Sequence, residues 1–334
     1  MPAPETFALG TLTLQSGETV PDAQITYATY GTLNADRSNA ILYPTSYGAH
    51  HGDIDWLIGP GRVLDPDGWF IVIPNQFGNG LSSSPSNLAA PHPRPAFGHW
   101  DNVHAQERLL REVFGITRLA LIYGWSMGGQ QALHWGALFP DRVARICATC
   151  TSARTTPHNK VFLDGLRSAL MADPAWQDGR FIAHPERGLT AFARIYAGWA
   201  MSQAFYREEL WRSIGFTALE DYIKTAWEGR FMHRDPHDLL SMLDTWTRSD
   251  IADNDVFKGD LGGALGAIRA RTIILPSVTD LYFTADDSAI EVPQMPDAEL
   301  RPIQSIWGHR AGNPVEQPAD EAVLRQAVAD LLAD

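Results

Sequence analysis

The chain has few cysteines, no excess of positive charge and no long apolar run. Its two cysteines, Cys147 and Cys150, cannot build a disulfide framework across 334 residues, so cysteine usage does not call for an oxidising compartment. Lys and Arg number 26 against 39 Asp and Glu, which gives a net charge of −13. Because this charge repels phosphate backbones and anionic lipid surfaces, we expect neither nucleic acid nor a membrane as a partner.

Targeting signals are also missing from the sequence. The first ten residues carry neither a basic stretch nor an apolar core of the kind that makes a signal peptide. No later window reaches the roughly 18 consecutive apolar residues of a membrane-spanning helix. What is present, 45% hydrophobic and 19% charged residues, is typical of a globular protein that buries a large core. We therefore expect a folded, cytoplasmic protein.

Alternating strand-like and helix-like segments predict an α/β fold with a mostly parallel sheet. Apolar or Thr-, Ile-, Val- and Tyr-rich runs bounded by turn residues predict strands at 6–14, 23–30, 39–45, 69–74, 119–123, 143–149, 272–276 and 299–306. Helical patterns cover 105–114, 127–139 and 318–332. The near-continuous apolar runs among the strands are typical of a sheet that is covered on both faces.

A long helical insertion interrupts this alternation. Between 155 and 266 the sequence shows helical periodicity, many aromatic residues and no strand-like run. We therefore divide the chain into a core of residues 1–154 and 267–334 and a helical lid of residues 155–266. Together with Trp125, the aromatic residues of the lid suggest a substrate pocket with apolar walls.

The motif Gly124-Trp125-Ser126-Met127-Gly128 fits G-x-S-x-G. It directly follows the predicted strand 119–123 and directly precedes the predicted helix 127–139, which is the strand–turn–helix context of a nucleophile elbow. A serine hydroxyl is a weak nucleophile and needs a base, which in turn needs an acid to orient it. Ser126 is the candidate nucleophile of an enzyme that forms an acyl-enzyme intermediate.

Two residues beyond the lid can supply the acid and the base. Asp280 lies just past the carboxyl end of the strand 272–276, where catalytic groups collect in α/β sheets. His309 lies 29 positions further on, after the last predicted strand. The order Ser126, Asp280, His309 is the order expected for this kind of elbow. Asp286 and Asp287 remain alternatives, either as the acid itself or as helix caps.

Two backbone amides should hold the developing oxyanion. We expect one from Met127, at the start of the helix, and the other from Tyr47, in the loop 44–48 after the third strand. No metal is expected, because the spacing of His50, His51, Asp53 and Asp55 matches no ligand pattern and the C-x-x-C of Cys147 and Cys150 falls within and at the end of a core strand.

Further motifs resemble those of the homoserine O-acetyltransferase family of α/β-hydrolase-fold proteins. They are 56–61 (WLIGPG) with Asp65, 75–85 (NQFGNGLSSSP), 124–131 (GWSMGGQQ), and 235–240 (DPHDLL) with Asp244 and Asp250. The resemblance implies an α/β-hydrolase fold with an eight-stranded sheet and a homodimer that packs through the helical insertion. It covers nearly the whole chain.

The chain also departs from that family around the substrate. The family places Asp after the catalytic His, to hold the substrate's ammonium, whereas here Arg310 follows His309. Arg194 matches a family arginine near the substrate carboxylate, but Met201 stands where the family has Tyr. Trp125 puts a bulky side chain beside the nucleophile. The acyl-transfer machinery is kept while the amino-acid pocket differs.

The substrate-binding candidates are Thr45, Trp125, Arg194 and Arg310. The two arginines either meet a substrate carboxylate or are surface residues. We expect a hydrolase, similar to esterases, that acts on a small acyl substrate and needs no cofactor. One alternative is an O-acetyltransferase that takes acetyl-CoA as acyl donor and acts on homoserine or another alcohol. The other is a binding protein that keeps the fold without the activity.

Overall fold

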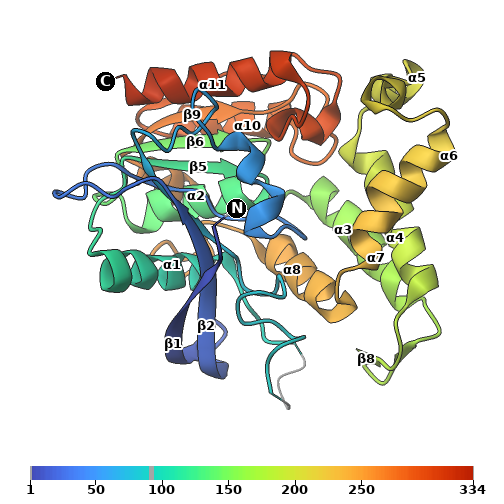
Figure 1. Ribbon diagram of the computed structural model, residues 1–334. Coiled ribbons are helices and arrows are strands. Elements are labelled where there is room, and N and C mark those ends of the chain that lie inside the picture. Colours follow the sequence, from blue (N-terminus) through green and yellow to red (C-terminus); the bar gives the residue numbers. More distant parts are fainter. Residues whose placement is uncertain (1, 90–93, 334) are drawn as a thin grey trace.

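A central eight-stranded sheet organises the molecule in the computed structural model, which describes residues 2–89 and 94–333 (Figure 1). Its strands are β1 (Glu5–Thr13), β2 (Thr19–Tyr30), β3 (Ala40–Leu42), β4 (Phe70–Pro74), β5 (Leu121–Trp125), β6 (Arg145–Thr149), β9 (Arg271–Leu275) and β10 (Ala298–Leu300). The spatial order is β1-β2-β4-β3-β5-β6-β9-β10; β2 pairs antiparallel with β1 and with β4, and the other neighbouring pairs among these strands are parallel. The predicted α/β class and mostly parallel eight-stranded sheet are confirmed.

Successive residues of the central strands are buried on opposite faces of the sheet. Ile41 and Leu121 join one apolar cluster, whereas their neighbours Leu42 and Ile122 join another. All four side chains are fully buried. Since side chains alternate along a strand, a continuous apolar run is what two covered faces require.

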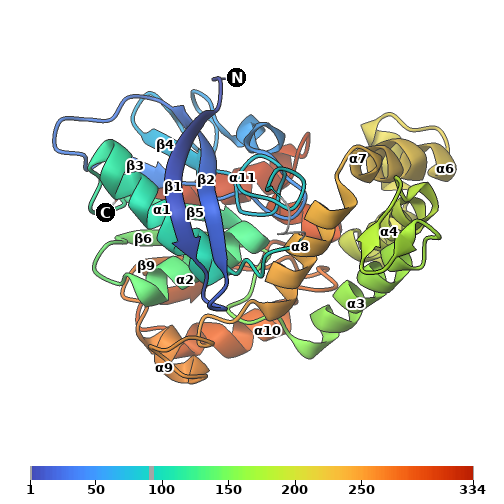
Figure 2. The same cartoon turned by 90° about the horizontal axis from the view of Figure 1, so that it is seen from below.

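Helices cover both faces (Figures 1 and 2). On one face lie α1 (His99–Phe114), α2 (Met127–Leu138) and α9 (Leu261–Gly266). The other face is covered by α11 (Pro318–Leu332) and by the segment that contains the short 3₁₀ helices η1 (His51–Asp53) and η2 (Asp55–Leu57). Within the described ranges, no helix combines the length and the apolar content needed to cross a bilayer.

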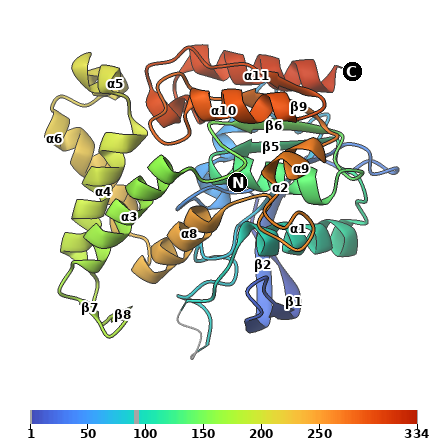
Figure 3. The same ribbon diagram turned by 180° about the vertical axis from the view of Figure 1, so that it is seen from behind.

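The helical segment forms a separate layer beside the core (Figure 3). Its elements are α3 (Pro157–Met171), α4 (Glu186–Ala200), α5 (Gln203–Arg207), η3 (Leu210–Ile214), α6 (Leu219–Tyr222), η4 (Ile223–Glu228), α7 (Gly229–Met232) and α8 (Pro236–Arg248). Its buried side chains, from Phe162 to Trp246, form an aromatic-rich cluster that also includes Tyr47, Met127, Tyr282 and Phe283 of the core. By contrast, α9 buries Ala264 and Leu265 in the cluster of the core, so the last part of 155–266 packs with the core.

Three details differ from the sequence-based expectation. A two-stranded hairpin, β7 (Trp176–Gln177) with β8 (Arg180–Phe181), lies in the segment where no strand is expected. The last strand is Ala298–Leu300 rather than 299–306, because Pro302 cannot donate to the ladder. Helix α1 begins at His99 rather than 105, where the Asp101 carboxylate accepts the Gly98 amide at 2.7 Å. The first turn of α1 is polar, so the apolar spacing that indicates a helix does not appear in the sequence until later residues.

A buried carboxyl group holds the chain where it leaves the core for the helical segment. Glu291 ends α10 (Ala285–Glu291), which is followed by the 3₁₀ helix η5 (Val292–Gln294). Its side chain is buried, and its two oxygens lie 3.1 and 2.9 Å from the amide nitrogen of Ala153. Burial raises the pKa of Glu291 to about 7.

We expect this glutamate to make stability fall as the pH rises. The folded protein binds a proton at Glu291 at pH values where the unfolded chain has lost it, so its contribution is complete below the unfolded pKa and is lost through pH 7. Glu291→Gln should remove up to about 3 kcal/mol of this dependence. Urea unfolding at pH 5 and pH 8.5 measures it, with Glu186→Gln, an exposed residue of α4, as control. Equal pH dependence in wild type and Glu291→Gln would contradict the expectation.

Candidate active site

Ser126 stands at the sharp turn between β5 and α2. Its backbone angles, φ 58° and ψ −126°, lie in a region that non-glycine residues rarely adopt. The turn is fixed by its amide, which donates to the Thr149 carbonyl at 3.0 Å, and by its carbonyl, which accepts from the Thr151 hydroxyl at 2.8 Å. The predicted strand–turn–helix around Ser126 is therefore present, with the strain expected of a nucleophile elbow.

Glycines make this turn possible by removing side chains from close backbone contacts. A Cβ at Gly124 would lie 2.3 Å from the Gly128 carbonyl oxygen, and one at Gly128 would lie 2.6 Å from the Pro44 carbonyl oxygen. One at Gly129 would meet the Thr151 side chain at 2.7 Å. These distances are too short for any larger residue, so strand and helix can approach only because glycines stand there.

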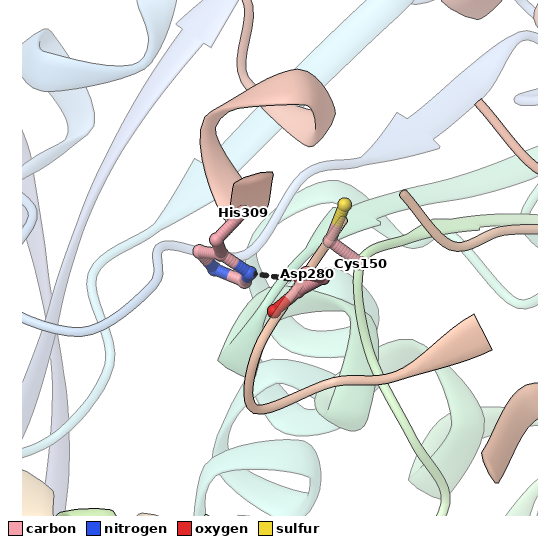
Figure 4. A group of neighbouring side chains, drawn as sticks. All are labelled: Cys150, Asp280 and His309. Atoms are coloured by element: carbon pink, nitrogen blue, oxygen red, sulfur yellow. Dashed lines mark hydrogen bonds and ion pairs between the residues drawn. The ribbon is translucent and has the colours of Figure 1, made fainter. Parts of the chain in front are cut away.

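Asp280 and His309 are brought together by a direct contact between their side chains (Figure 4). The Asp280 Oδ2 lies 2.6 Å from the His309 Nδ1, and both side chains are almost completely buried. The other oxygen, Oδ1, accepts the amides of Tyr282 and Phe283, each at 3.1 Å. Within the described residues, the buried Nε2 of His309 has no hydrogen-bond partner. This carboxylate therefore fixes the ring while Nε2 is left for another group.

The two alternative acids belong to the start of a helix. Asp286 and Asp287 lie in the first turn of α10. The Asp287 carboxylate accepts the Thr284 hydroxyl at 2.6 Å, while the Asp287 amide donates back to that hydroxyl at 3.1 Å. This is a capping arrangement. Of the two possibilities left open for Asp287, the structure shows the cap.

The loop that carries His309 packs against the elbow. The Trp125 indole nitrogen donates to the His309 carbonyl at 3.3 Å, and the two rings lie 5.0 Å apart. The Thr149 hydroxyl donates to the Gly312 carbonyl at 3.2 Å. A Cβ at Gly312 would lie 2.6 Å from the Trp125 ring. The 3₁₀ helix η6 (Gly308–Gly312), which carries His309, thus packs directly against the carboxyl ends of β5 and β6.

Tyr47 and Met127, the residues predicted to donate to the oxyanion, lie in two segments that contact each other through Ser46. The Ser46 hydroxyl donates to the Trp125 carbonyl and accepts the Gly128 amide at 3.4 Å, which joins the loop after β3 to the elbow. In the described part of the chain, neither the Tyr47 amide nor the Met127 amide has a hydrogen-bond acceptor. Both residues are buried. Buried amides without acceptors are rare, and they suit a site that binds negative charge.

Cys150 completes a buried group with Asp280 and His309 that could be considered a metal site. Figure 4 shows Cys150 beside Asp280, with the carboxylate joined to the histidine ring. A zinc ion holds its ligand atoms about 3.4 Å apart in a tetrahedral site. The Asp280 and His309 atoms are 2.6 Å apart, which is a hydrogen bond and leaves no room for an ion between them. Burial also raises the pKa of the Cys150 thiol, which favours the protonated form over a ligand thiolate. The group does not fit a metal.

A cavity of about 290 Å³ opens beside His309. Its walls include Trp125 and the aromatic side chains Tyr47, Tyr196, Tyr222, Trp227, Phe231 and Tyr282. Arg310 and Arg230 are its basic residues. Trp125 and Arg310 thus line the pocket as the sequence suggested. Arg230 was missed, because nothing in the spacing of the helical segment marks which face of it meets His309.

Two substrate-binding candidates lie elsewhere. Thr45 is fully buried, and its hydroxyl accepts the Gln76 amide at 2.9 Å, so it supports the loop rather than lining the cavity. Arg194 is on the outer side of α4, where it donates to Glu228 at 2.6 Å and to Glu220 at 2.5 Å. Its side chain is 43% exposed. The prediction that Thr45 and Arg194 contact substrate is corrected, since both side chains are engaged outside the cavity.

Comparison with known proteins connects this geometry to enzymes. A family model described as the alpha/beta hydrolase fold matches residues 48–241. Ethyl acetate hydrolase from Pseudomonas veronii is 38% identical over 311 residues, which cover 91% of this chain and 88% of that protein. The crystal structure of an acetylester hydrolase from Corynebacterium glutamicum matches with a TM-score of 0.95 at 36% identity, over 99% of this chain and 96% of that one.

A homoserine O-acetyltransferase from Mesorhizobium japonicum is 32% identical over 311 residues, which cover 83% of this chain and 79% of that protein. The resemblance drawn from the sequence motifs is therefore confirmed, as is the expectation of an enzyme, because the relatives are named as esterases and homoserine acyltransferases. By the family match and by this similarity along most of its length, the chain belongs to the α/β-hydrolase-fold family.

Proposed function

We propose that the protein is a serine esterase that hydrolyses small acyl esters through an acyl-enzyme intermediate. The observation that carries the proposal is the buried Asp280–His309 pair, whose Nε2 has no partner in the described residues. His309 lines the cavity together with Trp125, the residue directly before the strained turn at Ser126. In this arrangement Ser126 is the nucleophile, His309 the general base and then acid, and Asp280 the residue that orients the ring.

The reaction uses each of these groups in turn. The Ser126 Oγ bonds to the ester carbonyl carbon as its proton passes to the His309 Nε2. The carbonyl oxygen becomes an oxyanion, which the Met127 and Tyr47 amides stabilise. His309 then gives the proton to the departing alcohol, which leaves Ser126 acylated. Water attacks the acyl carbon, its proton passes through His309 to the serine oxygen, and the carboxylic acid leaves.

Water is the proposed acyl acceptor, and no cofactor is needed for this chemistry. The relatives at 38% identity over most of their length include an enzyme named for hydrolysis of ethyl acetate. An acetyltransferase that takes acetyl-CoA is the second candidate, favoured by the similarity to homoserine O-acetyltransferases. Against homoserine as acceptor, Arg310 brings a positive charge to the cavity, which repels an amine.

Three measurements decide between these candidates. We expect acetate release from p-nitrophenyl acetate and ethyl acetate, and labelling of Ser126 by a fluorophosphonate. We expect no CoA release from acetyl-CoA above background when homoserine or another alcohol is added. Release of CoA that depends on the alcohol would establish the transferase instead. A folded protein that neither hydrolyses esters nor reacts with the fluorophosphonate would support a binding role.

The remaining proposals concern the compartment and the oligomeric state of the enzyme. We propose, from composition, that it works in the cytoplasm. From its resemblance to the homoserine acetyltransferases, we propose that it forms a homodimer through the helical segment 155–266, which we regard as a lid over the core. Light scattering in solution tests the dimer.

A further inference from the structure

Two arginines lie in the cavity without a negatively charged partner. Arg230 on α7 and Arg310 on η6 both line the space beside His309. In the ranges 2–89 and 94–333, neither guanidinium group has a hydrogen bond or an ion pair. Arg194, which lies in the helical segment as Arg230 does, differs because it forms ion pairs with two glutamates. A partly buried charge without a partner is unfavourable unless something else offsets it.

Among the described residues, no carboxylate forms an ion pair with either arginine. Glu316 is the acidic lining residue of the cavity, is exposed, and forms no ion pair in the part of the chain that the structure describes. The Arg310 guanidinium lies 5.9 Å from the Trp125 ring centre. Burial, and then repulsion by Arg230, lowers the pKa of Arg310 to about 10. The group therefore stays charged at neutral pH, in a cavity whose remaining walls are largely aromatic.

The backbone that presents Arg230 is itself unusual. A π-helical turn, η4, runs directly into the short helix α7 that carries this residue. From this stretch Ala226, Trp227 and Arg230 face the cavity. Glu228, which lies between them, points to the other side and pairs with Arg194. Turns of this kind recur at functional sites, and here the nearest acid along the chain, Glu228 at the end of η4, is engaged by Arg194 rather than by Arg230.

We infer that Arg230 and Arg310 form a carboxylate-binding subsite, so that the preferred substrate is an ester that also bears a carboxylate. The inference rests on the proposed esterase function. A guanidinium group presents a planar fork that matches a carboxylate with two hydrogen bonds, and two such groups in the lining of one small, largely aromatic cavity can hold a short anionic chain beside His309. The carboxylate can belong to the acyl part or to the alcohol part of the ester.

Matched pairs of esters test the subsite. Monoethyl succinate against ethyl pentanoate places the charge in the acyl part, and acetoxyacetate against isobutyl acetate places it in the alcohol part. We expect kcat/KM to favour the charged member by roughly 10- to 100-fold in one of the pairs. Arg230→Met and Arg310→Met should each lower this ratio by at least about tenfold, and Arg310→Lys should lower it less, because the charge is kept without the fork. Arg194→Met, outside the cavity, should keep the wild-type ratio.

A binding measurement separates failure of the subsite from failure of the esterase. Ser126→Ala, mixed with monoethyl succinate or acetoxyacetate, should show a concentration-dependent rise in melting temperature that Arg230→Met or Arg310→Met removes. If the wild type hydrolyses neutral esters as well as charged ones in both pairs, the subsite is overturned and the esterase stands. If no ester is hydrolysed but the melting shift depends on the arginines, the subsite stands and the esterase is overturned. A ratio that both methionine variants leave unchanged also overturns the subsite.

Discussion

Ser126→Ala should lower kcat for p-nitrophenyl acetate by about 10⁵-fold or more, because the hydroxyl that bonds to the acyl carbon is gone. The loss should not come from unfolding. The Ser126 amide and carbonyl, which hold the elbow through Thr149 and Thr151, remain in the variant. Initial rates of p-nitrophenol release and a thermal melt measure both effects.

A residual rate close to that of the wild type would show that the acyl group is not carried by Ser126. Thr151→Val provides a comparison at the same turn. It removes a hydroxyl that binds the Ser126 carbonyl but is not proposed to react. Its effect on kcat should therefore be far smaller than that of Ser126→Ala.

Asp280→Asn should lower kcat by roughly 10⁴-fold. The carboxylate accepts a hydrogen bond from the His309 Nδ1 at 2.6 Å, which leaves Nε2 unprotonated and able to take the serine proton. An asparagine amide donates to Nδ1 instead and places the ring proton on Nε2. The imidazole then cannot act as a base, although the site keeps its shape. Pre-steady-state acylation with p-nitrophenyl acetate measures the step directly.

Asp287→Asn is the matched control, since the sequence left both residues open as the acid. Asp287 accepts the Thr284 hydroxyl in the first turn of α10, so its replacement should affect the melting temperature more than kcat. A large loss of kcat in Asp287→Asn, together with a small one in Asp280→Asn, would reverse the assignment.

The elbow and the sheet could be predicted because each depends on residues that are neighbours along the chain. The strand before Ser126 is apolar on both faces, and α2 starts one residue later, so the motif alone places the serine at the carboxyl end of a central strand. The same rule places Asp280 and His309 beyond later strands. The predicted ends of elements were wrong where the residue pattern did not indicate one element clearly, as at the polar first turn of α1 and at Pro302.

The candidate substrate residues were less predictable because they depend on how the helical segment meets the core. Motif position suggested Arg194, yet its side chain faces glutamates on the outer side of α4. Arg230 had no motif to mark it, and it reaches the cavity through a π-helical turn. Thr45 lies near the elbow in sequence terms, but its hydroxyl is used by the Gln76 amide.

The sequence by itself determined the fold class, the elbow and the chain order of the candidate nucleophile, acid and base, since apolar runs, glycines and chain order act over short stretches. Tertiary structure alone decided which side chains share the cavity, because the helical segment meets His309 with residues more than 75 positions away along the chain. It also revealed that no carboxylate of the described ranges forms an ion pair with Arg230 or Arg310. Whether a charge is paired depends on distances in space, which spacing along the chain does not fix.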